Sequence, residues 1–303
     1  MLRSLLLYLS ERETAKNILT HLPGGRRLPQ RFIAGEHLDD AVRVVRQLNG
    51  EGFDATLDHL GESVDQAAAA EESCRTYIEV LDRLAAEKLR SHISVKLTAL
   101  GLAFDEELCK QHLHSICECA ARHHNFVRID MEGSAYTEKT LRVFHEAGAP
   151  RDVLGVVIQS YLYRSDKDVQ DLTRAGARVR LVKGAYKEPP DVAFPRKTDA
   201  DANFVKLMKL LLASDGYHAI ATHDPRMIAS TKVWARANGV PADHFEFQML
   251  FGIRRNLQHK LLDQGYRMRI YVPYGRQWYA YFMRRLAERP ANVLFLARNL
   301  FRS

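Results

Sequence analysis

The sequence predicts an α/β fold, a (βα)8 barrel of the TIM type, and three observations support this prediction. Short apolar runs that are typical of buried strands alternate with longer stretches of helical periodicity. Eight such runs occur, and each is followed by a helical stretch. Strict alternation requires a parallel sheet with helical crossovers, and eight strands are the number that closes such a sheet into a barrel.

The expected strands lie at 53–60, 92–97, 126–131, 153–160, 179–182, 219–222, 245–250 and 268–272. The expected helices lie at 65–89, 106–123, 137–147, 166–175, 202–212, 227–238, 256–264 and from 277 onward. A doubly wound open sheet is the competing arrangement. Its dinucleotide-binding version carries Gly-x-Gly-x-x-Gly after a strand, and no such string occurs in this sequence.

The chain shows no low-complexity linker and no internal repeat that would divide the barrel. We therefore expect three parts: a helical N-terminal arm over 1–50, the barrel over 51–290 and a C-terminal tail helix over 291–303. Within the barrel, Pro273 and Gly275 are expected to end the last strand.

Composition is that of an ordinary globular protein, with 46% hydrophobic and 27% charged residues. No apolar run approaches the roughly 20 residues needed to cross a bilayer, and the N-terminal segment has no small-residue cleavage site. The net charge of +7 is spread along the chain, which permits contact with an anionic surface but is not typical of a nucleic-acid binder. These features predict a cytoplasmic protein.

The four cysteines form no regular framework, which suits a reducing compartment. Several of them share one predicted helix with histidines, a composition that raises the question of zinc. Cys117 and Cys119 point about 200° apart on a helix, so no metal site is expected from them.

Polar residues stand at or just beyond the ends of the expected strands. In a barrel of this type the chemistry gathers at the C-terminal ends of the strands. The residues in question are Asp58, Lys96, Asp130 with Glu132, Gln159, Arg180 with Lys183, Thr222 with His223, Gln248 and Tyr271. A single polar residue at a strand end is usually a cap. Polar residues at all eight strand ends predict a functional site at the C-terminal opening of the barrel.

The last strand and helix, 271–288, carry the most specific pattern. Tyr281, Arg284, Arg285 and Glu288 are spaced to share one helix face. Two guanidiniums about 6 Å apart repel by roughly 3 kcal/mol at an effective dielectric of about 20, so a pair inside a site favours anions. A solvated basic face is the alternative. The preceding strand and the aromatic run from Trp278 favour a site for a carboxylate.

This segment resembles the signature of the proline dehydrogenases, flavin-dependent enzymes that oxidise L-proline. Their pattern is Tyr-x-Pro-x-Gly followed by a helix with Tyr-x-x-Arg-Arg-x-x-Glu, and the resemblance extends over 32–288. It implies oxidation of L-proline to Δ1-pyrroline-5-carboxylate, FAD as cofactor and transfer of electrons to a quinone. The chain length of 303 residues matches the short, single-function bacterial type.

The resemblance also implies roles for individual residues, among them an ion pair between Lys96 and Asp130. Substrate contacts are expected from Lys96, Asp130, Ala185, Leu250, Tyr271, Tyr281, Arg284 and Arg285. Cofactor contacts are expected from Met131, Gln159, Arg180, Val182, Lys183, Gly184, Thr222, His223, Gln248 and Glu288. Catalytic roles are expected for Arg180, Lys96 and Tyr271, with water or Tyr271 taking the amine proton. Lys187 and Phe194 to Lys197 depart from the family pattern.

Two other functions fit the residues. Lys96 and Lys183 both end strands, and a desolvated lysine there is what a Schiff-base aldolase uses. A barrel that only binds an amino acid is a non-catalytic alternative. The tail at 293–302 is apolar with interspersed arginines, which fits either a helix on a membrane surface or a helix docked on the barrel.

Overall fold

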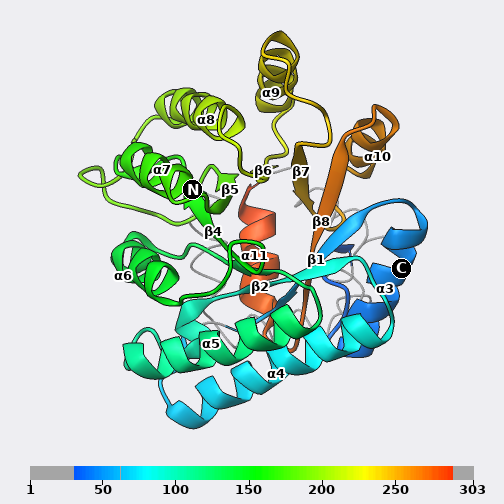
Figure 1. Ribbon diagram of the computed structural model, residues 1–303, viewed down its shortest axis with the longest axis vertical. Coiled ribbons are helices and arrows are strands. Elements are labelled where there is room, and N and C mark those ends of the chain that lie inside the picture. Colours follow the sequence, from blue (N-terminus) through cyan, green and yellow to red (C-terminus); the bar gives the residue numbers. More distant parts are fainter. Residues whose placement is uncertain (1–30, 62, 289–303) are drawn as a thin grey trace, which may run out of the picture.

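Eight parallel strands form a closed barrel in the order β1 to β8, with β8 returning to pair with β1 (Figure 1). The computed structural model describes residues 31–61 and 63–288. The strands are β1 Asp54–His59, β2 Ser91–Val95, β3 Val127–Ile129, β4 Leu154–Gln159, β5 Arg178–Val182, β6 His218–Ala221, β7 Phe245–Leu250 and β8 Arg267–Tyr274. The predicted fold class and all eight predicted strands are confirmed.

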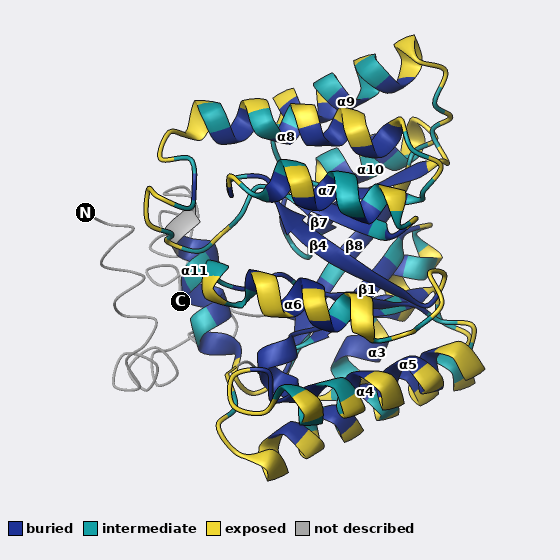
Figure 2. Ribbon diagram, turned by 60° about the vertical axis from the view of Figure 1, so that its left-hand side comes forward, coloured by how far each residue is buried: buried dark blue, intermediate teal, exposed yellow. Residues whose placement is uncertain are grey.

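Helices alternate with the strands along the chain. They are α3 Leu38–Gly50, α4 Ala67–Ala86, α5 Glu106–Arg122, α6 Ser134–Glu146, α7 Ser165–Arg174, α8 Lys197–Leu212, α9 Pro225–Ala237, α10 Arg255–Asp263 and α11 Trp278–Glu288, with a short 3-10 helix, Leu97–Leu100, after β2. Figure 2 shows buried residues on the helix faces toward the strands and exposed residues on the outer faces. This is the amphipathic arrangement that the sequence periodicity predicts.

The prediction that Pro273 ends the last strand is wrong, because β8 continues through Pro273 to Tyr274. The pairing register explains why proline is tolerated there. β7 ends at Leu250, which pairs with Tyr271, so the position of Pro273 lies beyond the end of β7 and lacks a ladder acceptor on that side. The missing N–H of proline therefore removes no sheet hydrogen bond. The Pro273 carbonyl instead accepts from Ala34 N at 2.9 Å.

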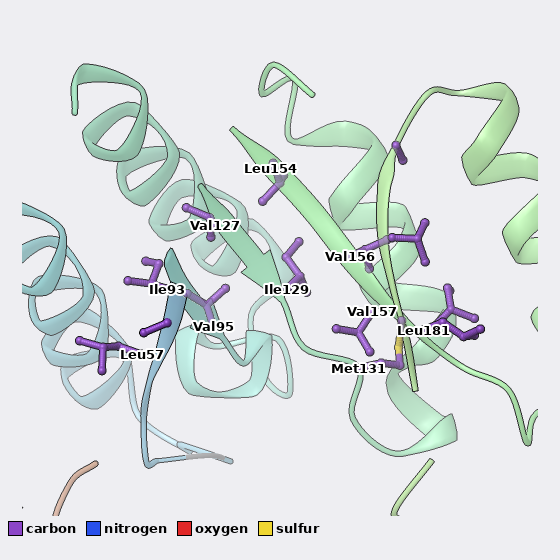
Figure 3. Close-up of a cluster of buried hydrophobic side chains, with 14 of the residues drawn as sticks. Leu57, Ile93, Val95, Val127, Ile129, Met131, Leu154, Val156, Val157 and Leu181 are labelled. Carbon is purple, nitrogen blue, oxygen red and sulfur yellow. The ribbon is translucent and has the colours of Figure 1, made fainter. Parts of the chain in front are cut away.

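Branched aliphatic side chains from neighbouring strands fill the main core (Figure 3). Ile93, Val127, Val156 and Leu181 are all fully buried. At about 25 cal/mol per Å² of apolar surface, the burial of such side chains is the dominant favourable term in folding. The core therefore gives the strand ends a rigid base.

A second apolar cluster holds α11 against the segment before α3. It contains the aromatic run that the sequence singled out, with Trp278, Tyr279, Tyr281 and Phe282 packed against Phe32 and Ile33. Two polar contacts add to it: the Trp278 indole Nε1 donates to Glu36 Oε1 at 3.0 Å, and Gly275 N donates to Gly35 O at 2.9 Å. These contacts fix the direction in which α11 leaves the barrel.

Parts of the predicted arm and the whole predicted tail lie outside the described residues, at 1–30 and 289–303. The last part of the predicted helical arm is present as α3. None of the described helices is long and apolar enough to cross a membrane. All four cysteines are buried free thiols.

His218, the first residue of β6, is a buried neutral histidine. Its Nδ1 accepts from Val179 N at 3.2 Å, so the proton is on Nε2, which lies 2.8 Å from Ser214 Oγ. Burial, reinforced by Arg128 and Arg178, lowers the pKa from its ordinary 6.5 to about 3. In mild acid His218 therefore stays neutral in the folded protein, whereas the same histidine is protonated in the unfolded chain.

We predict that this histidine destabilises the protein in mild acid. Below pH 6.5 the unfolded chain gains a proton at this position and the folded chain does not, so the free energy of unfolding falls by about 2 kcal/mol by about pH 5. In His218→Gln, urea unfolding at several pH values is expected to show a decline smaller by that amount. His114→Gln, at an exposed histidine of α5, serves as the control. An unchanged pH dependence in His218→Gln would contradict the assignment.

Candidate active site

A cavity of about 630 Å³ lies at the C-terminal end of the barrel. Every strand contributes a lining residue, either from its last positions or from the residue just after it, and α11 closes one side. Figure 1 shows α11, in red, crossing the middle of the ring of strands. The polar strand ends that the sequence predicted to converge line one cavity, except Glu132, whose carboxylate instead accepts hydrogen bonds from Thr98 N and Oγ1.

Every residue with a predicted substrate or cofactor role lines this cavity, except Glu288, whose side chain lies outside the described part of the chain. Other lining residues had no individually predicted role, although some of them lie in the segments 221–225 and 245–250 that the family resemblance places along the flavin. They are Asp58, Val157, Tyr186, Lys197, Ala221, Asp224, Pro225, Met249 and Arg254. Asp58 was noted only as a polar strand end, and Lys197 only as a departure from the family pattern.

The lining carries an excess of positive charge. The basic side chains are Lys96, Arg180, Lys183, Lys197, Arg254, Arg284 and Arg285, and the acidic ones are Asp58, Asp130 and Asp224. Seven basic groups against three acidic groups create a positive potential in a low-dielectric cleft. The cavity therefore suits an anionic ligand.

The arginine pair of α11 takes the place that its spacing predicts. Tyr281, Arg284 and Arg285 all line the cavity. Arg285 is 9% exposed, and its guanidinium carbon lies 5.1 Å from the centre of the Tyr281 ring. This cation–π contact orients the guanidinium while it remains within reach of the cavity. The alternative of a solvated basic helix face does not hold for these two arginines.

Asp130 anchors one side of the cavity. It follows β3, and its two oxygens have different partners: Arg180 Nη1 donates to Oδ1 at 2.8 Å, and Tyr271 Oη donates to Oδ2 at 2.6 Å. Arg180 also donates through Nη2 to Ser94 Oγ at 3.1 Å. These bonds hold side chains from four different strands in one fixed arrangement.

Tyr271 is a hydrogen-bond donor in this arrangement. Burial raises the pKa of its phenol well above the ordinary value, and the neighbouring Asp130 carboxylate raises it further. The phenolate form is therefore disfavoured. Tyr271 is better suited to holding Asp130 than to accepting a proton, which argues against its predicted role as the base.

Lys96 was predicted to pair with Asp130, but its nearer partner is Asp58. Lys96 Nζ lies 2.7 Å from Asp58 Oδ1 and 3.9 Å from Asp130 Oδ2. The sheet order does not decide between them, because β2 pairs with β1 on one side and with β3 on the other. A sequence with two aspartates at neighbouring strand ends does not show which of them is closer.

Lys183, after β5, lies between two carboxylates that the sequence did not single out. Its Nζ lies 2.5 Å from Asp201 Oδ1 and 2.9 Å from Asp224 Oδ2. Burial works against the ammonium form, but the hydrogen bonds to Asp201 and Asp224 prevail and raise the pKa. Asp224 also caps α9, where its side chain accepts from Arg226 N. An aspartate before a helix is explained by capping alone, so the sequence gave no reason to expect that Asp224 also pairs with Lys183.

Two buried polar atoms in the cavity lining lack partners among the described residues. Gln159 donates through Nε2 to Met131 O at 2.9 Å and to Glu132 O at 2.8 Å, while its Oε1 has no donor. Arg180 Nε has no acceptor. Such atoms carry a desolvation penalty of about 1–3 kcal/mol unless a ligand satisfies them. The site thus presents one acceptor and one donor to a polar ligand.

Gly184 brings bare backbone to the cavity. Its φ is +113°, a conformation that side chains rarely adopt, and a Cβ there would lie 2.3 Å from the ring of Tyr161. Nearby, His223 Nε2 accepts from Leu250 N at 3.0 Å, which joins the ends of β6 and β7. The N–H proton of His223 is therefore on Nδ1.

Solved structures show the same barrel in longer proteins. Proline utilization A (PutA) from Bdellovibrio bacteriovorus, in a structure inactivated by N-propargylglycine, superimposes with a TM-score of 0.83 at 30% identity. The match covers 91% of this chain and 34% of that one, so the chain spans about a third of that longer protein.

Curated relatives of similar length cover nearly the whole chain. Proline dehydrogenase 1 of Bacillus subtilis (strain 168) is 43% identical over 305 residues, with 100% of both chains aligned. Proline dehydrogenase 2 of the same strain is 43% identical over 91% of both chains. Proline dehydrogenase of Deinococcus radiodurans is 40% identical over 91% of this chain and 90% of that one. The sequence profile described as Proline dehydrogenase matches residues 41–298. The chain belongs to the proline dehydrogenase family.

Proposed function

We propose that the protein oxidises L-proline to Δ1-pyrroline-5-carboxylate, the first step of proline catabolism, with FAD as its cofactor. One observation carries the proposal: seven basic side chains face one cavity that also presents an unpaired buried acceptor and an unpaired buried donor. The carboxylate of a small amino acid can bind to the basic side chains. The N–H and the nitrogen or oxygen atoms of a polar aromatic ring can pair with the buried acceptor and donor.

The carboxylate of proline is proposed to bind Arg284, Arg285 and Lys96. Each charge-assisted hydrogen bond of this kind contributes about 1.5–3 kcal/mol. Leu250 and Tyr281 line the same cavity and give the pyrrolidine ring an apolar surface. Alignment of the ring by groups on a helix and on strands reduces the entropy lost in reaching the transition state.

The residues present fit a flavin. Gln159 Oε1 suits a ring N–H, Arg180 Nε suits a ring nitrogen or oxygen, and the backbone at Gly184 leaves room for close approach. Lys183 and Lys197 line the cavity too, and their ammonium groups suit the diphosphate of FAD. When bound, the flavin supplies the two-electron acceptor for the C–N oxidation. The positive charge of Arg180 favours added negative charge nearby.

Proline enters as a zwitterion, so its amine must lose a proton before oxidation. Tyr271 is held as a phenol and donates to Asp130. Water is therefore the better acceptor for the amine proton. The role proposed for Tyr271 is to orient Asp130 and, through it, Arg180.

The alternatives are less compatible with the site. A Schiff-base aldolase needs a neutral lysine, whereas Lys183 is ion-paired with two carboxylates that raise its pKa and Lys96 is ion-paired with Asp58. A barrel that only binds an amino acid has no need of the unsatisfied Gln159 Oε1 and Arg180 Nε in the cavity lining. A quinone is the proposed oxidant of the reduced cofactor. The tail at 293–302, proposed to contact the inner face of the cytoplasmic membrane, lies outside the described residues.

Loss of either arginine of α11 is predicted to weaken proline binding. In Arg284→Met or Arg285→Met we expect KM for proline to rise at least tenfold, because one charge-assisted hydrogen bond is lost. Bound flavin, measured by its absorbance relative to protein, should stay unchanged. Arg255→Met removes an exposed arginine of α10 outside the cavity lining and is the control. Normal proline kinetics in both cavity variants would refute the carboxylate assignment.

Substitution of Gly184 is predicted to lower flavin content. Gly184→Ala places a Cβ against the Tyr161 ring and strains a backbone with φ of +113°, so the loop must shift away from the cofactor. We expect purified Gly184→Ala to contain less than half of the wild-type flavin. The control Gly148→Ala also places an alanine at positive φ, at +62° in the left-handed α region where nothing lies within 4 Å, and should keep its flavin. Full flavin occupancy in Gly184→Ala would be incompatible with this role.

A further inference from the structure

Asp58 is a buried carboxylate at the mouth of the barrel. The resemblance to proline dehydrogenases implies no role for it. Asp58 is the fifth residue of β1, it is 1% exposed and it lines the cavity. Its Oδ1 lies 2.7 Å from Lys96 Nζ. An ionised carboxylate taken this far out of water requires a close cation or hydrogen-bond donors.

The Lys96 ammonium lies between two carboxylates but much closer to one of them. The ammonium is in contact with Asp58 but 3.9 Å from Asp130 Oδ2. That same Asp130 oxygen accepts from Tyr271 at 2.6 Å, and the other accepts from Arg180 at 2.8 Å. If Lys96 moved onto Asp130, it would compete with Tyr271 for one oxygen and would turn away from Asp58.

We propose that Asp58 is a positioning residue for proline binding: it holds the Lys96 ammonium off Asp130, so that Lys96 faces the substrate carboxylate and Asp130 remains bonded to Tyr271 and Arg180. This inference rests on the proposed function, because it gives Lys96 a substrate to face. It adds to that function a residue that acts through Lys96 without touching the substrate.

The charge balance supports this role. Burial raises the pKa of Asp58 above its ordinary value, while the Lys96 ammonium opposes the shift, so the ionised form depends on Lys96. Removing the charge of Asp58 leaves Asp130 as the nearest carboxylate to the buried Lys96 ammonium within the described part of the chain. A buried cation moves toward the nearest anion, since an uncompensated charge in a low-dielectric site is strongly disfavoured.

Four variants test the inference: Asp58→Asn, Lys96→Met, the double variant, and Asp54→Asn as a control. Asp54 lies on the same strand at the opposite end of the barrel, where it pairs with Arg269, Arg267 and Arg90. The assays are steady-state kinetics with L-proline, and the Kd of tetrahydrofuran-2-carboxylate measured from its perturbation of the flavin spectrum. This probe keeps the carboxylate of proline but lacks the amine.

Asp58→Asn is expected to raise both KM for proline and Kd for the probe at least tenfold, with a smaller change in kcat. In the Lys96→Met background the same substitution should change Kd less than twofold, because its effect passes through Lys96. Asp54→Asn should leave both constants unchanged. A crystal structure of Asp58→Asn should show Lys96 Nζ in contact with Asp130.

Equal effects of Asp58→Asn in the presence and absence of Lys96 would overturn the inference and leave Asp58 a structural residue. If Asp58→Asn alone does not fold, the double variant and Lys96→Met still decide, since the inference requires their Kd values to agree within twofold. Wild-type protein whose flavin is not bleached by proline would instead refute the proposed function, so the two failures are distinguishable.

Discussion

Positive charge held in place by neighbouring carboxylates is the constraint on which this site depends. Lys96 is fixed by Asp58, Arg180 by Asp130, and Lys183 by Asp201 and Asp224. Each pairing compensates the desolvation of a cation at the mouth of the barrel and leaves its direction fixed. The cationic groups can therefore remain close together in a dry cleft, where they act more strongly on an anion than they would in water.

In the lower part of the barrel a buried cation is likewise held by a carboxylate. Arg269 lies within the barrel 2.9 Å from Glu246 Oε1, and its Nη1 donates to Ala55 O at 2.7 Å. Arg128 is fully desolvated nearby, and burial lowers its pKa well below the ordinary value. This layer supports the strands from below, and Arg180 stands between it and the mouth. The residues that line the cavity are thus supported by a layer of polar side chains inside the barrel as well as by the apolar core.

The fold could be predicted from sequence because strand and helix periods alternate without interruption. The cavity lining could be predicted because the C-terminal ends of all strands of a parallel barrel lie together at one end of it. The partner of Lys96 could not, since Asp58 and Asp130 both end neighbouring strands and only the distances select Asp58. The pairing of Asp224 with Lys183 could not be predicted, because it joins residues that follow two different strands and lie 41 positions apart in the sequence. Pro273 was misjudged because its tolerance in β8 depends on where β7 ends, which is a property of register.

The most direct test of the central claim is an anaerobic titration of the purified protein with L-proline, followed by its visible spectrum. A site in which fixed cations hold a carboxylate beside a flavin predicts a yellow protein whose flavin band bleaches at saturating proline. It also predicts that pyrrolidine, which has the ring but no carboxylate, bleaches the band far more weakly at equal concentration. Equal bleaching by the two compounds would contradict the account, as would a band that proline leaves unchanged.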